Sequence, residues 1–194
     1  MTPRENDQRV LRAIRPATPD DAEAILAIYR PVVQETAISF EWTVPTVPEM
    51  QGRISSVLAD GFPWLVAADD GDITAYAYAS RFRSRTAYDW TAEVSVYVSE
   101  ARQRRGTGRA LYGRLLHVLE LQGFHSAYGF ATAPNPGSEG LHRSLGFTEV
   151  GRFSRVGYKF EKWHDVICWY KPLRPVSGIP STLRPLSEVL MEVE

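Results

Sequence analysis

Two apolar segments joined by a tight polar turn constrain the fold of this chain more than any other feature. Residues 64–68 and 73–82 are rich in aromatic and small apolar side chains, and Asp69-Asp70-Gly71-Asp72 separates them. Asp and Gly readily adopt the backbone conformations that tight hairpins need. The two segments therefore predict an antiparallel β-hairpin, which argues against a doubly wound, all-parallel sheet.

The remaining chain alternates between helix-like and strand-like segments. Apolar residues at helical spacing predict helices that begin at Thr18, cover 48–59 and 106–121, and follow Asn135. Strands are expected over 10–15, 93–98, 126–131, 147–155 and 158–170. The order is β-α-α-β-β-β-α-β-α-β-β, with a mixed central sheet flanked by helices. This order predicts an α/β (α+β) fold.

Length and proline placement indicate one domain with a tail. The 194 residues are 44% hydrophobic, which suffices for one domain with a substantial core. Beyond Lys171, prolines at 172, 175, 180 and 185 predict an extended arm, with room for a short helix after it. We expect one folded domain over 10–171 and a proline-containing C-terminal extension over 172–194.

Charge and cysteine usage exclude several classes of function. The net charge of −1 provides no global field for nucleic acid or a membrane surface, and no apolar run approaches the roughly 20 residues of a membrane span. Cys168 is the only cysteine, so neither an intrachain disulfide nor a multi-cysteine metal site is expected, and no metal is predicted. Residues 1–8 do not resemble a signal peptide. We expect a cytoplasmic globular protein.

The most specific local signal is an arginine-rich turn between a strand and the best helix. Its residues are Gln103, Arg104, Arg105, Gly106, Thr107, Gly108 and Arg109, and Arg102 precedes them. Glycines allow a ligand to approach the backbone, and a helix start offers unpaired N–H groups with a partial positive charge. Guanidinium groups add paired donors for phosphate oxygens. The turn predicts a diphosphate site, and the alternative is a glycine turn with a solvated basic flank.

Two common nucleotide motifs do not fit this turn. A Walker loop requires lysine where Arg109 follows Gly108, and a dinucleotide fingerprint requires Gly or Ala where Leu111 stands. The strand over 93–98 spans roughly 17 Å when extended. A ligand with its phosphates at Gly106 and a long arm along this strand would end near Glu93. Coenzyme A, with its pantetheine arm, has that shape.

These residues resemble the GNAT acetyltransferase superfamily, and one branch of it more closely: the phosphinothricin, methionine sulfoximine and methionine sulfone N-acetyltransferases. The resemblance covers about residues 12–171. The motifs that carry it, besides Gln103, Gly106 and Gly108, are Tyr88-Asp89-Trp90-Thr91-Ala92-Glu93, Val96-Tyr97-Val98, Gly108-Arg109-Ala110-Leu111-Tyr112, Gln122-Gly123-Phe124, Pro134-Asn135, Leu141-His142, Gly157-Tyr158-Lys159 and Trp163-His164-Asp165-Val166. In this branch Gly-rich residues often follow the Tyr-Lys pair, whereas Phe160-Glu161-Lys162 stand here.

The resemblance implies a GNAT-like single domain that uses acetyl-CoA as co-substrate. The strand residues Val96 and Val98 would line the pantetheine arm, the turn over 103–109 would hold the diphosphate, and Asn135 and Ser138 would complete the cofactor site. A backbone N–H between Val94 and Val96 would stabilise the oxyanion.

Acetyl transfer also needs a base for the amine and a proton for the thiolate. Glu93 is the candidate base, because partial burial at the start of an apolar strand would raise its pKa. His142 stands where many GNAT enzymes have an acidic tyrosine, and it can be an acid, a base or a structural residue. Tyr97 and Tyr112 are weaker acid candidates.

The resemblance also indicates where an amino-acid substrate would bind. Arg85 and Tyr88 look like substrate-contacting positions, since a guanidinium matches a carboxylate or phosphinate. Phe40, and less surely Trp64, would wall the side-chain pocket, with core packing as the alternative for both. Arg83 is interpreted as a solvated neighbour. His164 and Asp165 lack a serine or cysteine nucleophile at a recognisable spacing and are interpreted as structural or pocket-supporting.

The leading hypothesis is an N-acetyltransferase for phosphinothricin, methionine sulfoximine or a related amino acid, acting through a ternary complex as a homodimer. One alternative is acetylation of a protein N-terminus or lysine, which needs an open groove. The other is a non-catalytic CoA-binding sensor, against which the presence of both Glu93 and His142 speaks.

Overall fold

A computed structural model of the chain describes residues 14–193. Its centre is one seven-stranded sheet with the order β1-β2-β3-β4-β5-β7-β6, in which β4–β5 is the parallel pair and the other neighbours are antiparallel. The strands are β1 (Ile14–Pro16), β2 (Trp64–Asp69), β3 (Asp72–Arg81), β4 (Thr91–Val98), β5 (Ser126–Ala133), β6 (Thr148–Lys159) and β7 (Lys162–Pro172). The predicted mixed, mostly antiparallel sheet is confirmed.

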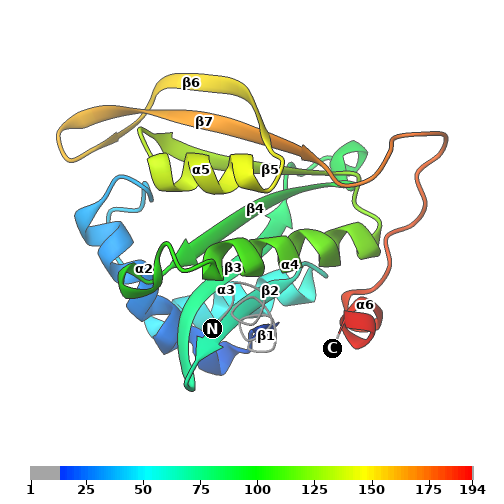
Figure 1. The fold of residues 1–194 in the computed structure, drawn as a ribbon, viewed down its shortest axis with the longest axis horizontal. Helices are drawn as coiled ribbons and strands as arrows, with labels where there is room; N and C mark the ends of the chain where they lie inside the picture. Colours follow the sequence, from blue (N-terminus) through cyan, green and yellow to red (C-terminus); the bar gives the residue numbers. More distant parts are fainter. Residues whose placement is uncertain (1–13, 194) are drawn as a thin grey trace.

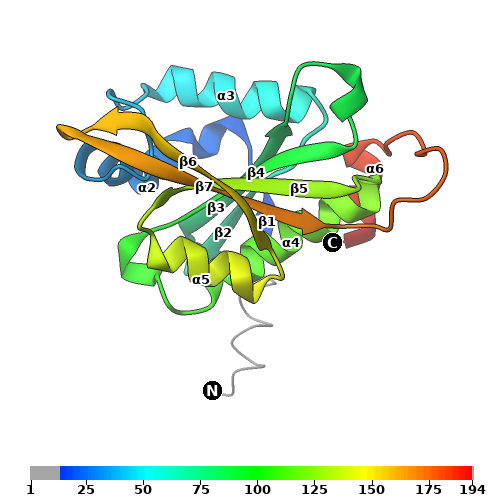
Figure 2. The same cartoon turned by 90° about the horizontal axis from the view of Figure 1, so that it is seen from above.

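Helices cover both faces of the sheet, as the view from above shows (Figure 2). One face carries α2 (Ala22–Glu35) and α3 (Val47–Ala59), and the other carries α4 (Thr107–Gln122) and α5 (Pro136–Ser144). The remaining helical segments are η1 (Pro19–Asp21), η2 (Thr86–Tyr88), η3 (Glu100–Arg102) and α6 (Leu186–Val193). The first described helix follows Thr18 in a capping box, as expected.

Alternation along the strands divides the core into two layers. Ala92 and Val94 of β4 pack towards α4, whose apolar stripe includes Leu111 and Leu115. Tyr97 of the same strand packs on the opposite face with the apolar stripe of α2, which consists of Ala22, Ile25, Leu26, Tyr29 and Val33. All five of these α2 residues are buried, so the predicted helix face is confirmed.

Several strand boundaries differ from the sequence prediction. The first strand is predicted to begin at residue 10, and residues 10–13 lie outside the described part of the chain. The predicted bounds of the late strands, 147–155 and 158–170, are wrong: β6 continues to Lys159, and the turn is formed by Phe160 and Glu161, whose φ angles are 49° and 59°. At 154–156 the strand only bulges, with Arg155 at a φ of 51° and a register shift between Phe153 and Gly157.

The C-terminal extension packs back onto the domain. After Pro172 the chain runs without regular structure to α6, whose Val189 is fully buried. Leu183 contacts the core, the amide of Arg184 donates to the carbonyl of Gln122 at 2.7 Å, and the Arg184 side chain pairs with Glu192 of α6. The predicted arm and short helix are both present. Among residues 14–193, no helix is long and apolar enough to cross a membrane.

Candidate active site

The candidate site begins where β4 and β5 separate. The two strands pair only at Thr91–Ser126, Ala92–Ala127 and Glu93–Tyr128, although β4 continues to Val98 and β5 to Ala133. Beyond Glu93 each strand keeps its pairing with its other neighbour, β3 or β7. The sheet therefore opens as a wedge, visible as two diverging arrows in Figure 1.

The backbone of β4 presents polar groups to this wedge. The amide of Ser99, just beyond β4, donates to the carbonyl of Thr74 in β3 at 2.9 Å, so the odd-numbered residues of β4 bond towards β3. Because antiparallel pairing alternates, the peptide groups of Val94, Val96 and Val98 face the β5 side. The carbonyl of Val94 accepts from the Tyr112 hydroxyl at 3.4 Å, which agrees with this direction.

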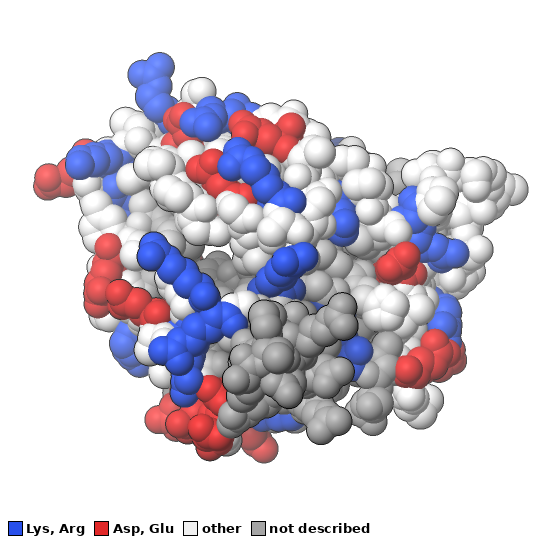
Figure 3. Space-filling model, viewed as in Figure 1, with Lys and Arg blue, Asp and Glu red and all other residues white. Residues whose placement is uncertain are grey.

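A cleft of about 560 Å³ occupies the wedge and reaches both faces of the sheet. Val32 and Ile38 line it on the α2 face, together with Ser95 and Tyr97. On the other face, Lys and Arg side chains surround a hollow beside α4 and α5 (Figure 3). The predicted site residues that line the cleft are Val96, Val98, Gln103, Arg104, Gly106, Gly108, Arg109, Asn135, Ser138 and His142.

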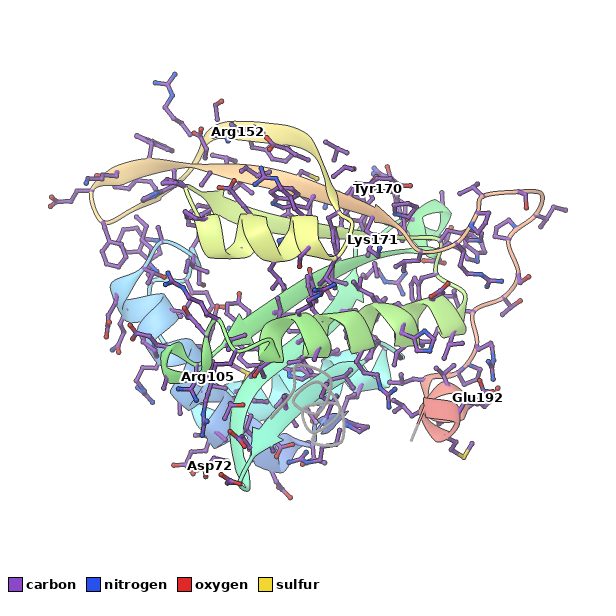
Figure 4. All side chains as sticks on the ribbon, in the orientation of Figure 1. Asp72, Arg105, Arg152, Tyr170, Lys171 and Glu192 are labelled. Carbon is purple, nitrogen blue, oxygen red and sulfur yellow. The ribbon has the colours of Figure 1, made fainter. Side chains whose placement is uncertain are left out.

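The arginine-rich turn forms the basic end of the cleft. Arg104 and Gly106 both have positive φ, 60° and 87°, and α4 begins at Thr107 with no side chain capping its first N–H groups. These N–H groups and the guanidinium of Arg109 are therefore available to an anion. Arg105, labelled in Figure 4, and Thr107 belong to the turn but do not line the cleft. Arg102 does line it and pairs with Asp69 at 2.7 Å.

The close approach of α4 to β4 depends on a glycine. A Cβ added at Gly108 would lie 3.0 Å from Cγ2 of Val98, which lines the cleft. The Gln103 amide nitrogen donates to the carbonyl of Val98 at 3.4 Å and fixes the turn against the strand end. Asn135 caps α5 by accepting from the amide of Ser138 at 3.1 Å. Two helix N-termini therefore converge on this part of the cleft.

Glu93 lies at the apex of the wedge, at the last paired position of β4, and does not itself line the cleft. Its side chain is half-buried on the face that carries α2 and α3. Burial raises the pKa of Glu93, and the positive charge of Arg83 opposes that increase. The Arg83 guanidinium lies over the Phe82 ring at 4.4 Å. Arg83, interpreted from the sequence as a solvated neighbour, is thus the electrostatic partner of Glu93.

The burial of His142 favours its neutral imidazole form. Its Nδ1 lies 2.8 Å from the carbonyl oxygen of Ser138, and because a carbonyl only accepts, Nδ1 carries the proton. Nε2 lies 3.3 Å from the Tyr112 hydroxyl oxygen, whose one proton can be given either to Nε2 or to the carbonyl of Val94. His142 is 4% exposed, and burial lowers its pKa. A Cβ at Gly129 would lie 2.6 Å from Nε2, so this glycine leaves room for the imidazole.

Tyr112 is only a weaker acid candidate from the sequence, yet it lines the cleft between the wedge and His142. Burial raises its pKa, and the negative charge of Glu93 adds to the increase. The hydroxyl therefore stays protonated at neutral pH. A tyrosine within an amphipathic helix is usually packing, so the sequence held no signal that its hydroxyl reaches β4.

The predicted substrate residues lie outside the cleft lining. Arg85 precedes η2, Tyr88 is its last residue, and both are exposed, with the Tyr88 ring 5.9 Å from Phe82. Phe40 is half-buried, 6.2 Å from the His164 ring. Trp64 is 3% exposed and stacks on Tyr78 at 4.5 Å under α3, so the core interpretation holds for Trp64.

His164 and Asp165 do not form a relay. His164 Nε2 donates to the carbonyl of Lys159 at 2.9 Å, and Asp165 accepts from the amide of Arg155 at 2.8 Å. Both residues support the β6–β7 hairpin. Within residues 14–193, no cluster of three His, Cys, Asp or Glu side chains is arranged for a metal ion.

Comparisons with known proteins agree with this geometry. A sequence profile of the family described as "Acetyltransferase (GNAT) domain" matches residues 14–168. Phosphinothricin N-acetyltransferase of Streptomyces viridochromogenes is 38% identical over 176 residues, which cover 91% of this chain and 95% of the relative. L-methionine sulfoximine/L-methionine sulfone acetyltransferase of Pseudomonas paraeruginosa is 32% identical, covering 87% of this chain and 98% of the relative.

A solved structure is similar over the same region. The crystal structure of a phosphinothricin acetyltransferase from Sinorhizobium meliloti in complex with AcCoA superposes with a TM-score of 0.81 at 35% identity. The similarity covers 88% of this chain and 96% of that one.

Proposed function

Because this chain belongs to the GNAT acetyltransferase family and is an N-acetyltransferase related to the phosphinothricin and methionine sulfoximine enzymes, we propose that it transfers the acetyl group of acetyl-CoA to the amine of a small amino-acid-like substrate. The observation that carries the proposal is the cleft through the β4–β5 wedge. It connects the basic turn on one face of the sheet with the face of Glu93 on the other. Two reactants entering from opposite faces would meet there, as direct transfer in a ternary complex requires.

The residues on the α4 face fit acetyl-CoA. Gly106, Gly108 and the unpaired N–H groups of α4 suit a diphosphate, with Arg104 and Arg109 as charged donors. The peptide groups of Val96 and Val98 that face the cleft suit the amides of a pantetheine arm, and Asn135 and Ser138 border the same space. When bound, acetyl-CoA supplies the thioester that the amine attacks.

Glu93 is the proposed base. The amine forms a bond to the acetyl carbon and loses a proton to Glu93, directly or through a water, while the C–S bond breaks and its electron pair stays on sulfur. The raised pKa of Glu93 makes its carboxylate a stronger base than an exposed glutamate. A backbone N–H between Val94 and Val96 is the proposed donor to the developing oxyanion.

We propose that His142 and Tyr112 together assist the departure of the thiolate leaving group. His142 is neutral and its one N–H is used by Ser138, so the Tyr112 hydroxyl is the group with a proton to present. In this proposal the single hydroxyl proton of Tyr112 turns from its contacts with Val94 and His142 to the departing sulfur, and the imidazole of His142 packs edge-to-face against the Tyr112 ring and keeps it at the wedge. Both groups are buried, which strengthens such a hydrogen bond.

The acceptor is proposed to bind on the face of α2 and α3. Arg85 and Tyr88 stand on the segment that leads into β4, where a guanidinium can pair with a carboxylate or phosphinate. Phe40 would contact the acceptor side chain. The proposed unit for this activity is the domain over 10–171, with 172–194 as an extension packed against α4. The cytoplasm is the expected compartment, since Cys168 is a free buried thiol.

Thiol release from acetyl-CoA tests the function directly. We expect turnover with phosphinothricin, methionine sulfoximine or methionine sulfone in a panel that also contains free amino acids and a peptide with a free N-terminus. Glu93→Gln should lower kcat by about 100-fold, because the amine proton then lacks its acceptor. Turnover with the peptide alone would favour protein acetylation, and CoA binding without any turnover would favour a sensor. Near wild-type kcat in the variant would remove Glu93 from the mechanism.

A further inference from the structure

The turn of the β6–β7 hairpin reaches the end of α2, far away in the sequence, and both ribbon views show the two side by side (Figures 1 and 2). Lys159, the last residue of β6, is only 2% exposed. Its Nζ donates to the carbonyl oxygens of Val33 at 2.6 Å, Thr36 at 2.9 Å and Ser39 at 2.7 Å. A lysine from the sheet edge thus binds the backbone at the end of α2.

These three bonds use all the donors of an ammonium group. Val33 lies in the last turn of α2, where carbonyls have no partner inside the helix and a positive charge is favourable. Thr36 and Ser39 belong to the irregular segment that follows, so their carbonyls also depend on an external donor. Lys159 therefore fixes the course of residues 36–39.

A second contact fixes the same segment from the Gly157–His164 pair, two pairs along the hairpin from Lys159. A Cβ added at Gly157 would lie 2.1 Å from the Phe40 ring, so the backbone of β6 rests directly on that ring. His164 donates to the carbonyl of Lys159 at 2.9 Å and keeps the turn in place. Residues 36–40 are thus held by two sequence motifs of the hairpin, Gly157-Tyr158-Lys159 and Trp163-His164-Asp165-Val166.

The segment held in this way forms part of the cleft wall. Ile38 lines the cleft beside Val32, and it stands between the two residues, Thr36 and Ser39, whose carbonyls Lys159 binds. The Thr36 hydroxyl donates to the carbonyl of Val32 at 2.7 Å and accepts from the amide of Ile38 at 3.1 Å. A chain of hydrogen bonds therefore connects Lys159, through Thr36, to Val32 in the α2 wall of the cleft.

We propose that Lys159 is a positioning residue for the acceptor amine: its ammonium, together with the Gly157–Phe40 contact, holds residues 36–40 as the acceptor wall of the cleft. The inference rests on the proposed function, which places the acceptor on this face. The cofactor half of the cleft is built from α4, α5 and the end of β4. Loss of the Lys159 bonds should therefore affect one substrate and not the other.

The first test compares Lys159→Met with Lys162→Met, which removes an exposed lysine from the other side of the same turn. With methionine sulfoximine or phosphinothricin as acceptor, Lys159→Met should raise the acceptor KM roughly tenfold and leave the acetyl-CoA KM within about twofold. Hydrogen exchange should quicken at the amides of 36–41 and stay unchanged in α4. Lys162→Met should match the wild type in every measurement.

The second test does not touch the charge. Gly157→Ala forces the Phe40 ring aside and should raise the acceptor KM selectively, whereas Gly151→Ala, on the same strand with nothing within 4 Å of the added Cβ, should not. In a Phe40→Ala background the Gly157→Ala change should have no further effect, because the ring it displaces is gone.

Two results would overturn the inference while leaving the proposed function intact. One is unchanged hydrogen exchange at the amides of 36–41 in Lys159→Met. The other is an equal rise of the acceptor KM and the acetyl-CoA KM in both Lys159→Met and Gly157→Ala. Absence of turnover by the wild type with every amine of the panel would instead reject the proposed function, and the inference with it. A general loss of folding would lower the active fraction without the selective rise in acceptor KM.

Discussion

Burial acts in opposite directions on the two titratable groups nearest the wedge. It raises the pKa of Glu93, because a carboxylate loses hydration, and it lowers the pKa of His142, because an imidazolium does. Both shifts favour the neutral forms. For Glu93 the positive charge of Arg83 partly restores the ionised form that a base needs. With Glu93 as the proposed base, we expect the reactivity of this site to depend on Arg83, a residue outside the cleft.

The acid limb of the pH profile tests this dependence. The rate should fall as pH decreases through the pKa of Glu93, because the protonated carboxyl cannot accept the amine proton. Arg83→Leu removes the charge that lowers this pKa, so the pKa rises further and the acid limb of kcat/KM moves to higher pH. Profiles of kcat/KM against pH for wild type and variant measure the shift.

Arg81→Leu is the matched control for that profile. Arg81 ends β3 and pairs with Asp89 at 2.6 Å, so its removal leaves the surroundings of Glu93 unchanged. Its acid limb should coincide with that of the wild type. An unmoved limb in Arg83→Leu would mean that Glu93 is not the group whose ionisation limits the rate.

Several site residues could be predicted because their roles depend on local sequence. The glycines and arginines of 103–109 precede a strong helix, and Asn135 followed by proline marks a helix start, so their roles follow from neighbouring residues. Arg83 and Tyr112 depend on contacts across the sheet. Whether Arg83 approaches Glu93, or the Tyr112 hydroxyl reaches Val94, is decided by strand pairing and helix placement, which no single segment encodes.

At the scale of elements, the start of α4 against the end of β4 gives the basic end of the cleft its shape. Helix and strand approach closely because residue 108 has no side chain, and an added Cβ would lie 3.0 Å from Val98. Such a contact is tighter than ordinary packing allows, so either the helix start or Val98 has to move. Both line the cleft.

We therefore expect Gly108→Ala to weaken acetyl-CoA binding more than acceptor binding. Overpacking of about 1.4 kcal/mol would raise the acetyl-CoA KM about tenfold. Gly113→Ala, also in α4, places its Cβ 3.8 Å from Leu145 in ordinary contact and should leave both KM values unchanged, with a slightly higher Tm from better helix propensity. Equal KM values in Gly108→Ala and wild type would argue against a ligand at the start of α4.

The β6–β7 turn shows what element boundaries require beyond local sequence. Its residues, Phe160 and Glu161, both adopt positive φ, although neither is a glycine or asparagine. Local preference therefore pointed to 156–157, near Gly157. The bonds of Lys159 to Val33, Thr36 and Ser39 favour the observed register, because a turn at 156–157 would carry Lys159 away from the end of α2.

At the scale of the whole molecule, the edge of the sheet exposes an apolar surface. Strand β6 is the edge strand, and its hairpin with β7 carries large exposed apolar side chains, up to 61% exposed at Trp163. These hairpin residues are Val150, Phe153, Val156, Tyr158, Phe160 and Trp163. An apolar, hydrogen-bonding edge of this kind is normally covered in solution.

A second copy of the chain is the proposed cover, in accord with the homodimer expected from the sequence. Light scattering at micromolar concentration should give twice the chain mass of 21.8 kDa. Trp163→Glu should shift the mass towards the monomer, since a carboxylate is costly to bury. Met191→Glu changes an even more exposed apolar residue outside the hairpin and should not shift the mass. A wild-type mass of one chain would contradict the proposal.

The order of elements and the sheet class were predictable from the chain because the hairpin turn at 69–72 and the helix signals are local. The wedge was not. Separation of β4 from β5 after Glu93 arises from strand pairings on their outer sides, and nothing in residues 94–98 or 129–133 distinguishes them from a paired strand.

The cleft passes through the sheet and therefore opens on both faces. The residues around one opening can change independently of those around the other. Under the proposed function, substitutions around residues 36–40 and the β6–β7 turn would alter which amine is admitted without disturbing the proposed diphosphate site on the opposite side. Evolution can thus exchange acceptors on one scaffold, which accords with relatives named for different amino-acid analogues. For engineering, the α2-side mouth is the region to randomise, while the arginine-rich turn is left untouched.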